Sequence, residues 1–354
     1  MSIMIKKIII KFSILFCFVL IVTSLSQSED SLFVAFWNLQ NLFDTIDDPL
    51  KEDEEFLPDG GMEWTEERLD KKIYNLAQVI RMMNNEKGPD LLGFCEVENE
   101  NVIRLMTEKY LNDLDYEIAY IESPDNRGID NGLIYRKTAF KLINVQADTI
   151  HLSDDYPTRL IFGANLLDKN NEQITVFVNH WPSRRGGRIE SEPNRIQAAN
   201  KQREAVDRIF STDQVAKIFI LGDFNDDPVN ISLLQNLRAH PIKCDSINAE
   251  FEIKWEGELF NLSYQSYEDG LGTYKYKETW NMLDQIIVSG SLITDDNFYY
   301  ICDSFEVHKP IYMVTQSGEY KGTPFPTFGG RRHLGGYSDH FPVTAKFVLK
   351  GIEK

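Results

Sequence analysis

Residues 217–225, KIFILGDFN, combine an apolar segment with polar residues at its end. Lys217–Leu221 is short and rich in Ile and Phe, which is typical of a strand buried in a sheet. Asp223 and Asn225 follow within four residues, and Asp and Asn are also common turn residues after a strand. Taken alone, this stretch leaves two interpretations open, a polar turn and the edge of a catalytic site.

Apolar segments end in polar residues at several other places along the chain. Asn38 follows SLFVAFW, Glu96 follows DLLGFC and His180 follows ITVFVN; Asp284 lies within NMLDQIIV, and Asp339 and His340 precede the last predicted strand. Because open α/β sheets collect their ligands at strand ends, we expect these side chains to converge on one edge. Together they form the inventory of a hydrolytic metal site, and hard oxygen ligands favour Mg²⁺ or Mn²⁺ over structural zinc.

Local patterns between these segments predict a single domain over residues 31–350. Thr65 begins a helix with one apolar face, a second helix surrounds Leu105, and a third covers Arg195–Phe210. Strands and helices interleave without a strict βαβ repeat, and several strands follow one another through short turns, which favours mixed sheets. Further strands are predicted at Glu117–Ile121, Gly132–Tyr135, Arg159–Leu166, Gln173–Asn179, Met282–Val288 and Pro342–Leu349.

Six motifs resemble those of the endonuclease/exonuclease/phosphatase superfamily, which includes pancreatic DNase-type nucleases and sphingomyelinases. They occur in the family's order: FWN (36–38), FCEV (94–97), VNH (178–180), GDFN (222–225), MLDQI (282–286) and SDHFP (338–342). They extend from about Leu32 to Phe347, and six ordered motifs are far more specific than one. The chain is therefore similar to a DNase I-like, secreted bacterial-type member of this superfamily. The resemblance implies an α/β fold, a four-layer α/β/β/α sandwich of two mixed β-sheets.

The resemblance also implies a role for each matching residue. The expected catalytic residues are His180, Asp223, Asn225, Asp284 and His340, and the expected metal ligands are Asn38, Glu96 and Asp339. Asp223, held by Asn225, would activate the attacking water, while His180 and an Asp284-oriented His340 would contact the scissile phosphate. This agrees with in-line attack on a phosphodiester, because a metal and imidazolium donors stabilise the charge that develops on oxygen.

Two positions depart from the family pattern. Gln40 stands where many nucleases of the family have a second carboxylate, which weakens the case for a two-carboxylate metal shell after the first strand. Cys95 replaces the usual Gln before Glu96, so a side-chain amide is missing beside the expected metal ligand. One-metal and two-metal chemistry therefore both remain open.

Arginines after His180 are candidates for substrate contacts. WPSRRGGR (181–188) carries Arg184 and Arg185, and guanidinium groups match phosphate oxygens. The alternative is a solvated loop whose arginines pair with Glu190 and Glu192. Arg127 and Asn131 precede another strand and are further candidates for contact with the substrate phosphate.

The N-terminus predicts export. Lys6, Lys7 and Lys11 precede an apolar run from Phe12 to Val22 and then small residues, which is typical of a signal peptide over residues 1–26. The run is short for a membrane span, although a retained anchor is the alternative. We expect a secreted or periplasmic protein. Cys95 is expected to be a buried thiol, and whether Cys244 and Cys302 pair is open.

Charge and motifs together leave three functions. The formal net charge of −18, from 37 Lys+Arg against 55 Asp+Glu, disfavours tight binding of nucleic acid through bulk electrostatics. The first expectation is nevertheless a monomeric, extracytoplasmic endonuclease that depends on Mg²⁺ or Mn²⁺. The alternative is a phosphoesterase acting on a lipid or small-molecule phosphoester. A catalytically inactive binding module is the alternative from another class.

Overall fold

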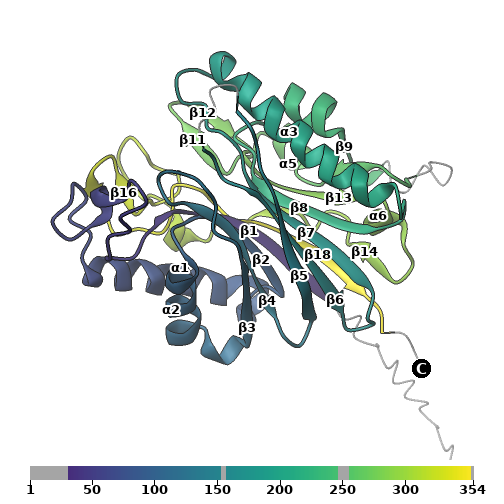
Figure 1. Ribbon diagram of the computed structural model, residues 1–354, viewed down its shortest axis with the longest axis horizontal. Coiled ribbons are helices and arrows are strands. Elements are labelled where there is room, and N and C mark those ends of the chain that lie inside the picture. Colours follow the sequence, from purple (N-terminus) through teal and green to yellow (C-terminus); the bar gives the residue numbers. More distant parts are fainter. Residues whose placement is uncertain (1–30, 153–156, 246–254, 352–354) are drawn as a thin grey trace, which may run out of the picture.

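Two mixed β-sheets lie at the centre of the computed structural model, which describes residues 31–152, 157–245 and 255–351 (Figure 1). In the first sheet the strand order is β14-β18-β1-β2-β4-β3, with β15 also pairing with β18. In the second sheet the order is β5-β6-β7-β8-β13-β10-β9. Both sheets are mixed, because β1–β2 and β7–β8 are parallel pairs among antiparallel ones. The predicted signal peptide, residues 1–26, lies outside the described residues.

The elements have the following bounds. The strands are β1 (Ser31–Leu42), β2 (Leu91–Val97), β3 (Tyr116–Tyr120), β4 (Asp130–Arg136), β5 (Phe140–Asp148), β6 (Ile161–Asp168), β7 (Gln173–His180), β8 (Lys217–Asp223), β9 (Ala239–Pro241), β10 (Leu259–Asn261), β11 (Tyr274–Tyr276), β12 (Thr279–Asn281), β13 (Asp284–Ser289), β14 (Phe298–Tyr300), β15 (Glu306–Val307), β16 (Phe328–Gly329), β17 (Arg332–His333) and β18 (Val343–Leu349). The helices are α1 (Glu66–Glu86), α2 (Glu100–Tyr110), α3 (Arg188–Phe210), α5 (Tyr264–Glu268) and α6 (Ser291–Thr294), with short helical turns at Glu54–Phe56, Asn112–Leu114, Ser232–Leu237 and Ile311–Met313.

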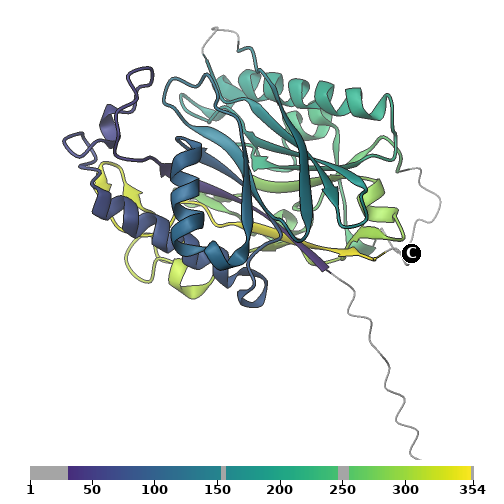
Figure 2. The ribbon, with the colours of Figure 1, turned by 60° about the horizontal axis from the view of Figure 1, so that its bottom comes forward.

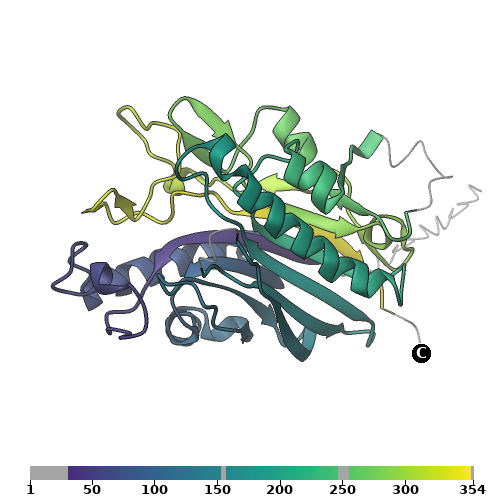
Figure 3. The same cartoon turned by 45° about the horizontal axis from the view of Figure 1, so that its top comes forward.

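Helices cover the outer faces of both sheets. Figures 2 and 3 show α1 and α2 against the first sheet and α3 against the second, so that the two sheets are enclosed between helical layers. This confirms the predicted α/β fold with its four-layer sandwich of two mixed sheets. Strands β1, β2, β7 and β8 are buried along almost their whole length, as expected for strands covered on both faces.

Close contact between the two sheets requires a glycine at one position. A Cβ at Gly93 of β2 would lie 3.1 Å from Leu221 and 3.2 Å from Val178, which belong to β8 and β7 of the second sheet. Contacts this short leave little room for a side chain, so Gly93 keeps the sheets close beside the carboxyl ends of these strands.

The first two helices begin at side-chain caps. The hydroxyl of Thr65 accepts a hydrogen bond from the Arg68 N–H, and the amide oxygen of Asn99 accepts one from the Val102 N–H at 3.0 Å. Both contacts satisfy N–H groups that lack a partner within the helix. The start predicted at Thr65 is thereby confirmed.

Helix α3 begins seven residues earlier than the predicted start at Arg195, and Pro193 lies inside it. Two side chains make additional hydrogen bonds to carbonyls at its start. Ser191 Oγ donates to the Gly187 carbonyl at 2.6 Å, which also accepts the Ser191 N–H, and Arg195 Nη2 donates to the Arg188 carbonyl at 2.8 Å. These bonds support the turn that precedes the proline.

Several strands escaped prediction because they are short or lie at an edge. β5 pairs only with β6, and its residues alternate in exposure without a long apolar run. The small hairpins β11–β12 and β16–β17 also escaped prediction. Their two- and three-residue strands carry too little pattern to be recognised locally.

The acidic loop Asp47–Glu55 packs against neighbouring parts of the chain. Asp53 is buried, and its Oδ2 accepts a hydrogen bond from the Asp48 N–H at 3.0 Å. Lys51 extends away from the loop and donates to the Ser123 carbonyl at 2.8 Å. The loop is therefore folded onto the segment that precedes β4.

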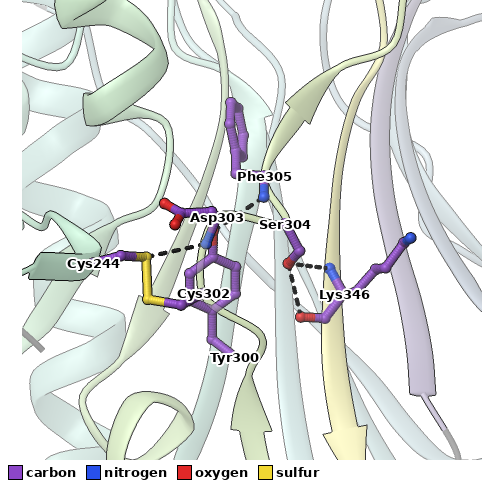
Figure 4. The surroundings of a disulfide bond; sticks show 7 residues. All are labelled: Cys244, Tyr300, Cys302, Asp303, Ser304, Phe305 and Lys346. Carbon is purple, nitrogen blue, oxygen red and sulfur yellow. Dashed lines mark hydrogen bonds between the residues drawn. A yellow bond between two sulfur atoms is a disulfide. The ribbon is translucent and has the colours of Figure 1, made fainter. Parts of the chain in front are cut away.

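A disulfide answers the open question about the cysteines. Cys244 and Cys302 are bonded (Figure 4). Cys95 is a buried free thiol, as expected. Cys244 Sγ also accepts a hydrogen bond from the Asp303 N–H at 3.0 Å, and Ser304 bonds to Lys346 of β18. The disulfide thus joins the segment after β9 to the chain between β14 and β15.

We predict that this disulfide stabilises the fold. Replacing Cys244 and Cys302 together by Ser should lower the free energy of unfolding by about 2–4 kcal/mol, because the unfolded chain loses a cross-link across 58 residues. Urea titration with and without dithiothreitol measures the effect. The reductant should destabilise the natural protein but not the double variant; equal stability of the two oxidised proteins would contradict the prediction.

Candidate active site

The carboxyl ends of β1, β2, β7 and β8 lie at one edge of the sandwich. His180 at the end of β7 is in register with Asp223 at the end of β8, which is in turn in register with Asp284 at the start of β13. The amide nitrogen of Asn38 spans the two sheets, donating to Glu96 Oε1 at 3.2 Å and to Asp223 Oδ2 at 3.1 Å. The fold therefore brings together residues that are far apart in the sequence, such as Asn38 and Asp223, which are separated by 185 positions.

Left-handed backbone marks this edge. Gln40, Asn41, Glu96 and Asn225 have φ values of 50°, 52°, 60° and 50°. The pairing register shifts between Asn38 and Leu42 of β1 and between Cys95 and Val97 of β2. Non-glycine residues adopt this conformation at a cost and cluster at functional sites. Here the bulges turn Glu96 and the residues after Asn38 out of the regular ladder.

His340 and Asp284 form a buried dyad. His340 Nδ1 lies 2.6 Å from Asp284 Oδ2, and both residues are almost fully buried. Burial lowers the pKa of His340, but the Asp284 carboxylate, with Asp223 and Asp339, outweighs it and raises that pKa well above its ordinary value. The ring of Tyr274 stacks on the imidazole with ring centres 4.7 Å apart. The expected orientation of His340 by Asp284 is present, and the dyad favours an imidazolium.

Asp223 lies opposite this dyad. Its Oδ2 is 3.9 Å from His340 Nε2, and its Oδ1 accepts a hydrogen bond from the Asn225 backbone N–H at 2.9 Å. Asn225 therefore holds Asp223 as expected, but through its main chain; its side-chain amide donates to the Trp181 carbonyl. Burial raises the pKa of Asp223, with His340 acting in the opposite direction.

His180 has the opposite electrostatic character. Its Nε2 lies 3.7 Å from Glu96 Oε1 and 3.8 Å from Asp223 Oδ2. Burial, followed by the guanidinium groups of Arg159 and Arg127, lowers its pKa well below the ordinary value, so that the neutral imidazole is favoured. Its buried Nδ1 has no hydrogen-bond partner among the residues that the structure describes.

The expected metal ligands are only partly in a ligand arrangement. Glu96 faces the gap beside His180, and burial raises the pKa of Asp339 to about 6, with His340 lowering it and Glu96 raising it. Asn38 is turned the other way: its Oδ1 accepts the Gln40 N–H at 2.9 Å, and its nitrogen faces the carboxylates. In this arrangement Asn38 is a donor that spaces the carboxylates and cannot coordinate a metal.

Carboxylates are the prevailing charged groups at this edge. Those of Glu96, Asp223, Asp284 and Asp339 lie near the cations of His340 and Lys72, with the Arg159–Asp125 pair beside His180. Oxygen ligands of this kind suit Mg²⁺ or Mn²⁺. Within the described ranges, the trio Asp223, Asp284 and His340 also has ligand atoms within 4.8 Å of one another. We do not interpret these three residues as a metal site, because His340 is paired with Asp284 as an imidazolium and an imidazolium has no lone pair for a metal.

The guanidinium of Arg184 contacts neighbouring residues of the fold. Nε donates to the Asn225 carbonyl at 2.7 Å, Nη1 to Asn281 Oδ1 at 2.7 Å, and Nη2 lies 3.0 Å from Asp227 Oδ2. Asp226 is paired with Arg195 at 2.8 Å. Arg184 therefore pairs with the acidic residues after β8 and not with the glutamates of α3, and its contact with a substrate phosphate stays a prediction. The acidic pair directly after GDFN was the signal that the sequence analysis did not use.

The other substrate candidates differ in their surroundings. Arg185 is exposed on the loop after β7, and Arg127 is half-exposed, with Nε 3.6 Å from Asp125 Oδ1. Asn131 is buried, and its amide nitrogen donates to the Leu160 carbonyl at 2.8 Å. The residue before β6 therefore holds the amide nitrogen of Asn131, and its contact with a substrate phosphate stays a prediction.

Two buried cations of the site escaped the sequence analysis. Arg159 pairs with Asp125 at 3.3 Å and donates to the Trp181 carbonyl at 2.8 Å, so it supports the chain directly after His180. Lys72 lies on the inner face of α1. A usable signal existed in both cases: each is a basic residue at a position where the pattern predicts burial, and such residues are rarely buried unless paired.

Comparison with known proteins agrees with this geometry. A family model described as "Endonuclease/Exonuclease/phosphatase family" matches residues 33–349. No curated protein matches the chain. A mannosyl-6-phosphatase of Bacteroides thetaiotaomicron is 16% identical, with a TM-score of 0.54 over 90% of this chain and 100% of that chain.

Two eukaryotic structures are similar in fold. The human Nocturnin catalytic domain with a bound sulfate anion is 17% identical, with a TM-score of 0.52 over 90% of this chain and 95% of that chain. D. rerio TDP2, complexed with a single-strand DNA product, is 13% identical, with a TM-score of 0.51 over 90% of this chain and 98% of that chain. The family model matches nearly the whole described chain and the fold agrees. The chain therefore belongs to the endonuclease/exonuclease/phosphatase family and is a hydrolase acting on phosphoester bonds.

Proposed function

We propose that this protein is an extracytoplasmic phosphoesterase that uses one Mg²⁺ or Mn²⁺ ion and a water molecule activated by Asp223. The observation that carries the proposal is that a proton donor and a proton acceptor face each other at the site. The Asp284-bound imidazolium of His340 faces the Asp223 carboxylate, with Nε2 and Oδ2 3.9 Å apart. A base and a proton-bearing donor at this spacing are what hydrolysis of a phosphoester requires.

The residues divide the chemistry between them. Asp223, held by the Asn225 N–H and the Asn38 amide, accepts a hydrogen bond from the attacking water and takes its proton. His340 donates to a phosphoryl oxygen, and the neutral His180 donates through Nε2 to a second one. Glu96 and Asp339 would hold the divalent ion, which supplies Lewis-acid stabilisation of charge on the phosphoryl group. Burial of these groups strengthens each interaction, because little water screens it.

A small or lipid phosphoester is the substrate class that the charge distribution favours. Asp226 and Asp227 pair with the guanidinium groups of Arg184 and Arg195, so fewer of the cations near His180 are left to contact a nucleic acid. A formal net charge of −18 opposes the binding of long polyanions. A phosphosugar enzyme among the structures of similar fold is consistent with this class.

An endonuclease is the second candidate. Arg185 and Arg188 are exposed beside the start of α3, and Arg127 is half-exposed near His180 although it pairs with Asp125, so these three cations are accessible to a phosphate backbone. The similar fold of a protein crystallised with a single-strand DNA product is consistent with it. A panel of plasmid DNA, RNA, sphingomyelin, an aryl phosphodiester and a sugar phosphate, each with Mg²⁺, Mn²⁺ or EDTA, separates the two candidates.

Two features support location outside the cytoplasm. The charged and apolar residues of segment 1–26 have the pattern of a signal peptide. The Cys244–Cys302 disulfide is typical of proteins that fold in an oxidising compartment. In the described part of the chain, no helix is long and apolar enough to cross a membrane.

We predict that Asp223→Asn and Glu96→Gln each abolish metal-dependent hydrolysis. Loss of the base or of the metal ligand should lower kcat by about 10²–10⁴. Asp59→Asn and Glu319→Gln change the same groups at exposed positions and should retain full activity. Turnover on the best substrate of the panel, together with circular dichroism, measures this. Full activity in either site variant would refute the role given to that residue.

We predict different effects for neighbouring arginines. Arg184→Met should destabilise the fold by about 1–3 kcal/mol, because Asp226 and Asp227 lose a cation and two polar partners lose a donor. Arg185→Met should change stability by no more than about 0.5 kcal/mol. Urea unfolding of both variants gives the comparison. Equal effects would show that the contacts of Arg184 carry no free energy.

We predict that the protein is exported and trimmed. Expression of the full chain in a bacterium with a secretion pathway, followed by fractionation and intact-mass analysis, should give an extracytoplasmic protein that lacks about residues 1–26. Deletion of residues 2–26 should retain the protein in the cytoplasm. A full-length chain found only in the cytoplasm would contradict the proposed location.

A further inference from the structure

Lys72 is a buried ammonium group whose location needs an explanation. It lies on the inner face of α1, where the residue is 1% exposed, beside the apolar residues Leu69, Ile73 and Leu76 of the same face. Lysine is almost never fully buried unless it is paired. A methionine at this position would cost less desolvation, so the ammonium is expected to have a role that an apolar side chain cannot fill.

The ammonium joins α1 to two other segments. Nζ donates to the carbonyl of Gln40, near the end of β1, and to Thr327 Oγ1 at 3.1 Å. Thr327 Oγ1 in turn donates to the Tyr337 carbonyl at 2.8 Å, and the Thr327 N–H donates to the Gln40 side chain at 2.7 Å. Gln40 is thus held by its carbonyl and by its side chain, which explains how a glutamine serves at this position without acting as a metal ligand.

The segment that Lys72 holds touches the metal-binding edge directly. Gln40 and Asn41 are both left-handed, and the Asn41 N–H donates to Glu96 Oε2 at 3.0 Å. The Gln40 N–H donates to Asn38 Oδ1 at 2.9 Å, which directs the Asn38 nitrogen toward Glu96 and Asp223. Two consecutive non-glycine residues in this conformation persist only where surrounding contacts enforce it.

The electrostatic surroundings agree with this placement. Burial lowers the pKa of Lys72 to about 7, while Asp339 and then Glu96 act in the opposite direction. The ammonium therefore lies within the field of both expected metal-site carboxylates. The ring of Phe328, with its centre 5.3 Å from Nζ, covers it on another side.

We propose that Lys72 is a positioning residue for the metal site: it holds the Gln40–Asn41 turn, and the turn orients the Glu96 carboxylate. This rests on the metal-dependent chemistry proposed above, since Glu96 is the principal ligand there. Lys72 acts indirectly: its ammonium holds the Gln40 carbonyl, and the Asn41 N–H of the same turn donates to Glu96. Lys72 itself does not touch the substrate.

The sign of the effect on metal affinity distinguishes positioning from charge alone. If Lys72 acted only as a nearby positive charge, its removal would strengthen the binding of a divalent cation, because a repulsive charge would disappear. If it orients Glu96 through the turn, its removal weakens binding. Loss of a residue that orients a metal ligand typically costs 10–100-fold in affinity.

The test compares Lys72→Met with Lys71→Met, which removes the same group from the exposed neighbouring position. Isothermal titration with Mn²⁺, without substrate and well below the melting temperature, should show about 10–100-fold weaker binding for Lys72→Met and no change for Lys71→Met. Excess Mn²⁺ should restore kcat of Lys72→Met with KM for the substrate unchanged. Unchanged or tighter Mn²⁺ binding by Lys72→Met would overturn the proposal.

The result separates this inference from the proposed function. If the natural protein binds no Mn²⁺, both fail; if it binds Mn²⁺ and Lys72→Met binds it equally well, only the role of Lys72 fails. Should Lys72→Met not fold, Thr327→Val removes one of the two oxygens that accept from Nζ. That variant should also bind Mn²⁺ more weakly, and unchanged affinity would overturn the proposal equally.

Discussion

The gathering of four carboxylates at one edge of the sandwich, two of them fully buried, is the constraint on which the rest of the site depends. Ionised carboxylates in a poorly solvated place are costly unless cations or donors compensate them. Each unusual feature nearby supplies such compensation: the imidazolium of His340, the ammonium of Lys72 and the amide nitrogen of Asn38. A divalent cation, as proposed above, would compensate them further, so the same charges that oppose folding would support the chemistry.

The two histidines show how burial alone does not decide protonation. Both are almost fully buried, yet the pKa of His340 rises and that of His180 falls, because Asp284 contacts the first and guanidinium groups lie near the second. A site with one charged and one neutral imidazole can stabilise a phosphoryl group through two donors while adding only one positive charge. This division agrees with one cation-binding position beside Glu96, and it requires no second carboxylate at Gln40.

The arginines after β7 show the limit of reading charge from a linear sequence. Arg184 and Arg185 are adjacent, yet the first is bound to Asn225, Asn281 and the acidic pair after β8, while the second is exposed. Arg184 thereby supports the loop that carries Asp223 and Asn225. One cation of this cluster is therefore a structural support in the fold, which leaves fewer cations for a polynucleotide substrate.

Short-range patterns determined the fold class, the main strands and most residues that meet at the site, because alternation, helical spacing and motifs such as GDFN are local properties of the chain. The sequence also identified Asp284 as the partner of His340, although only through resemblance to a family. The tertiary structure alone decided what Lys72 contacts, which way the Asn38 amide faces, whether Cys244 meets Cys302, and that Arg184 is occupied. Each of these depends on a partner tens to hundreds of residues away, and the path of the folded chain, not the neighbouring sequence, selects that partner.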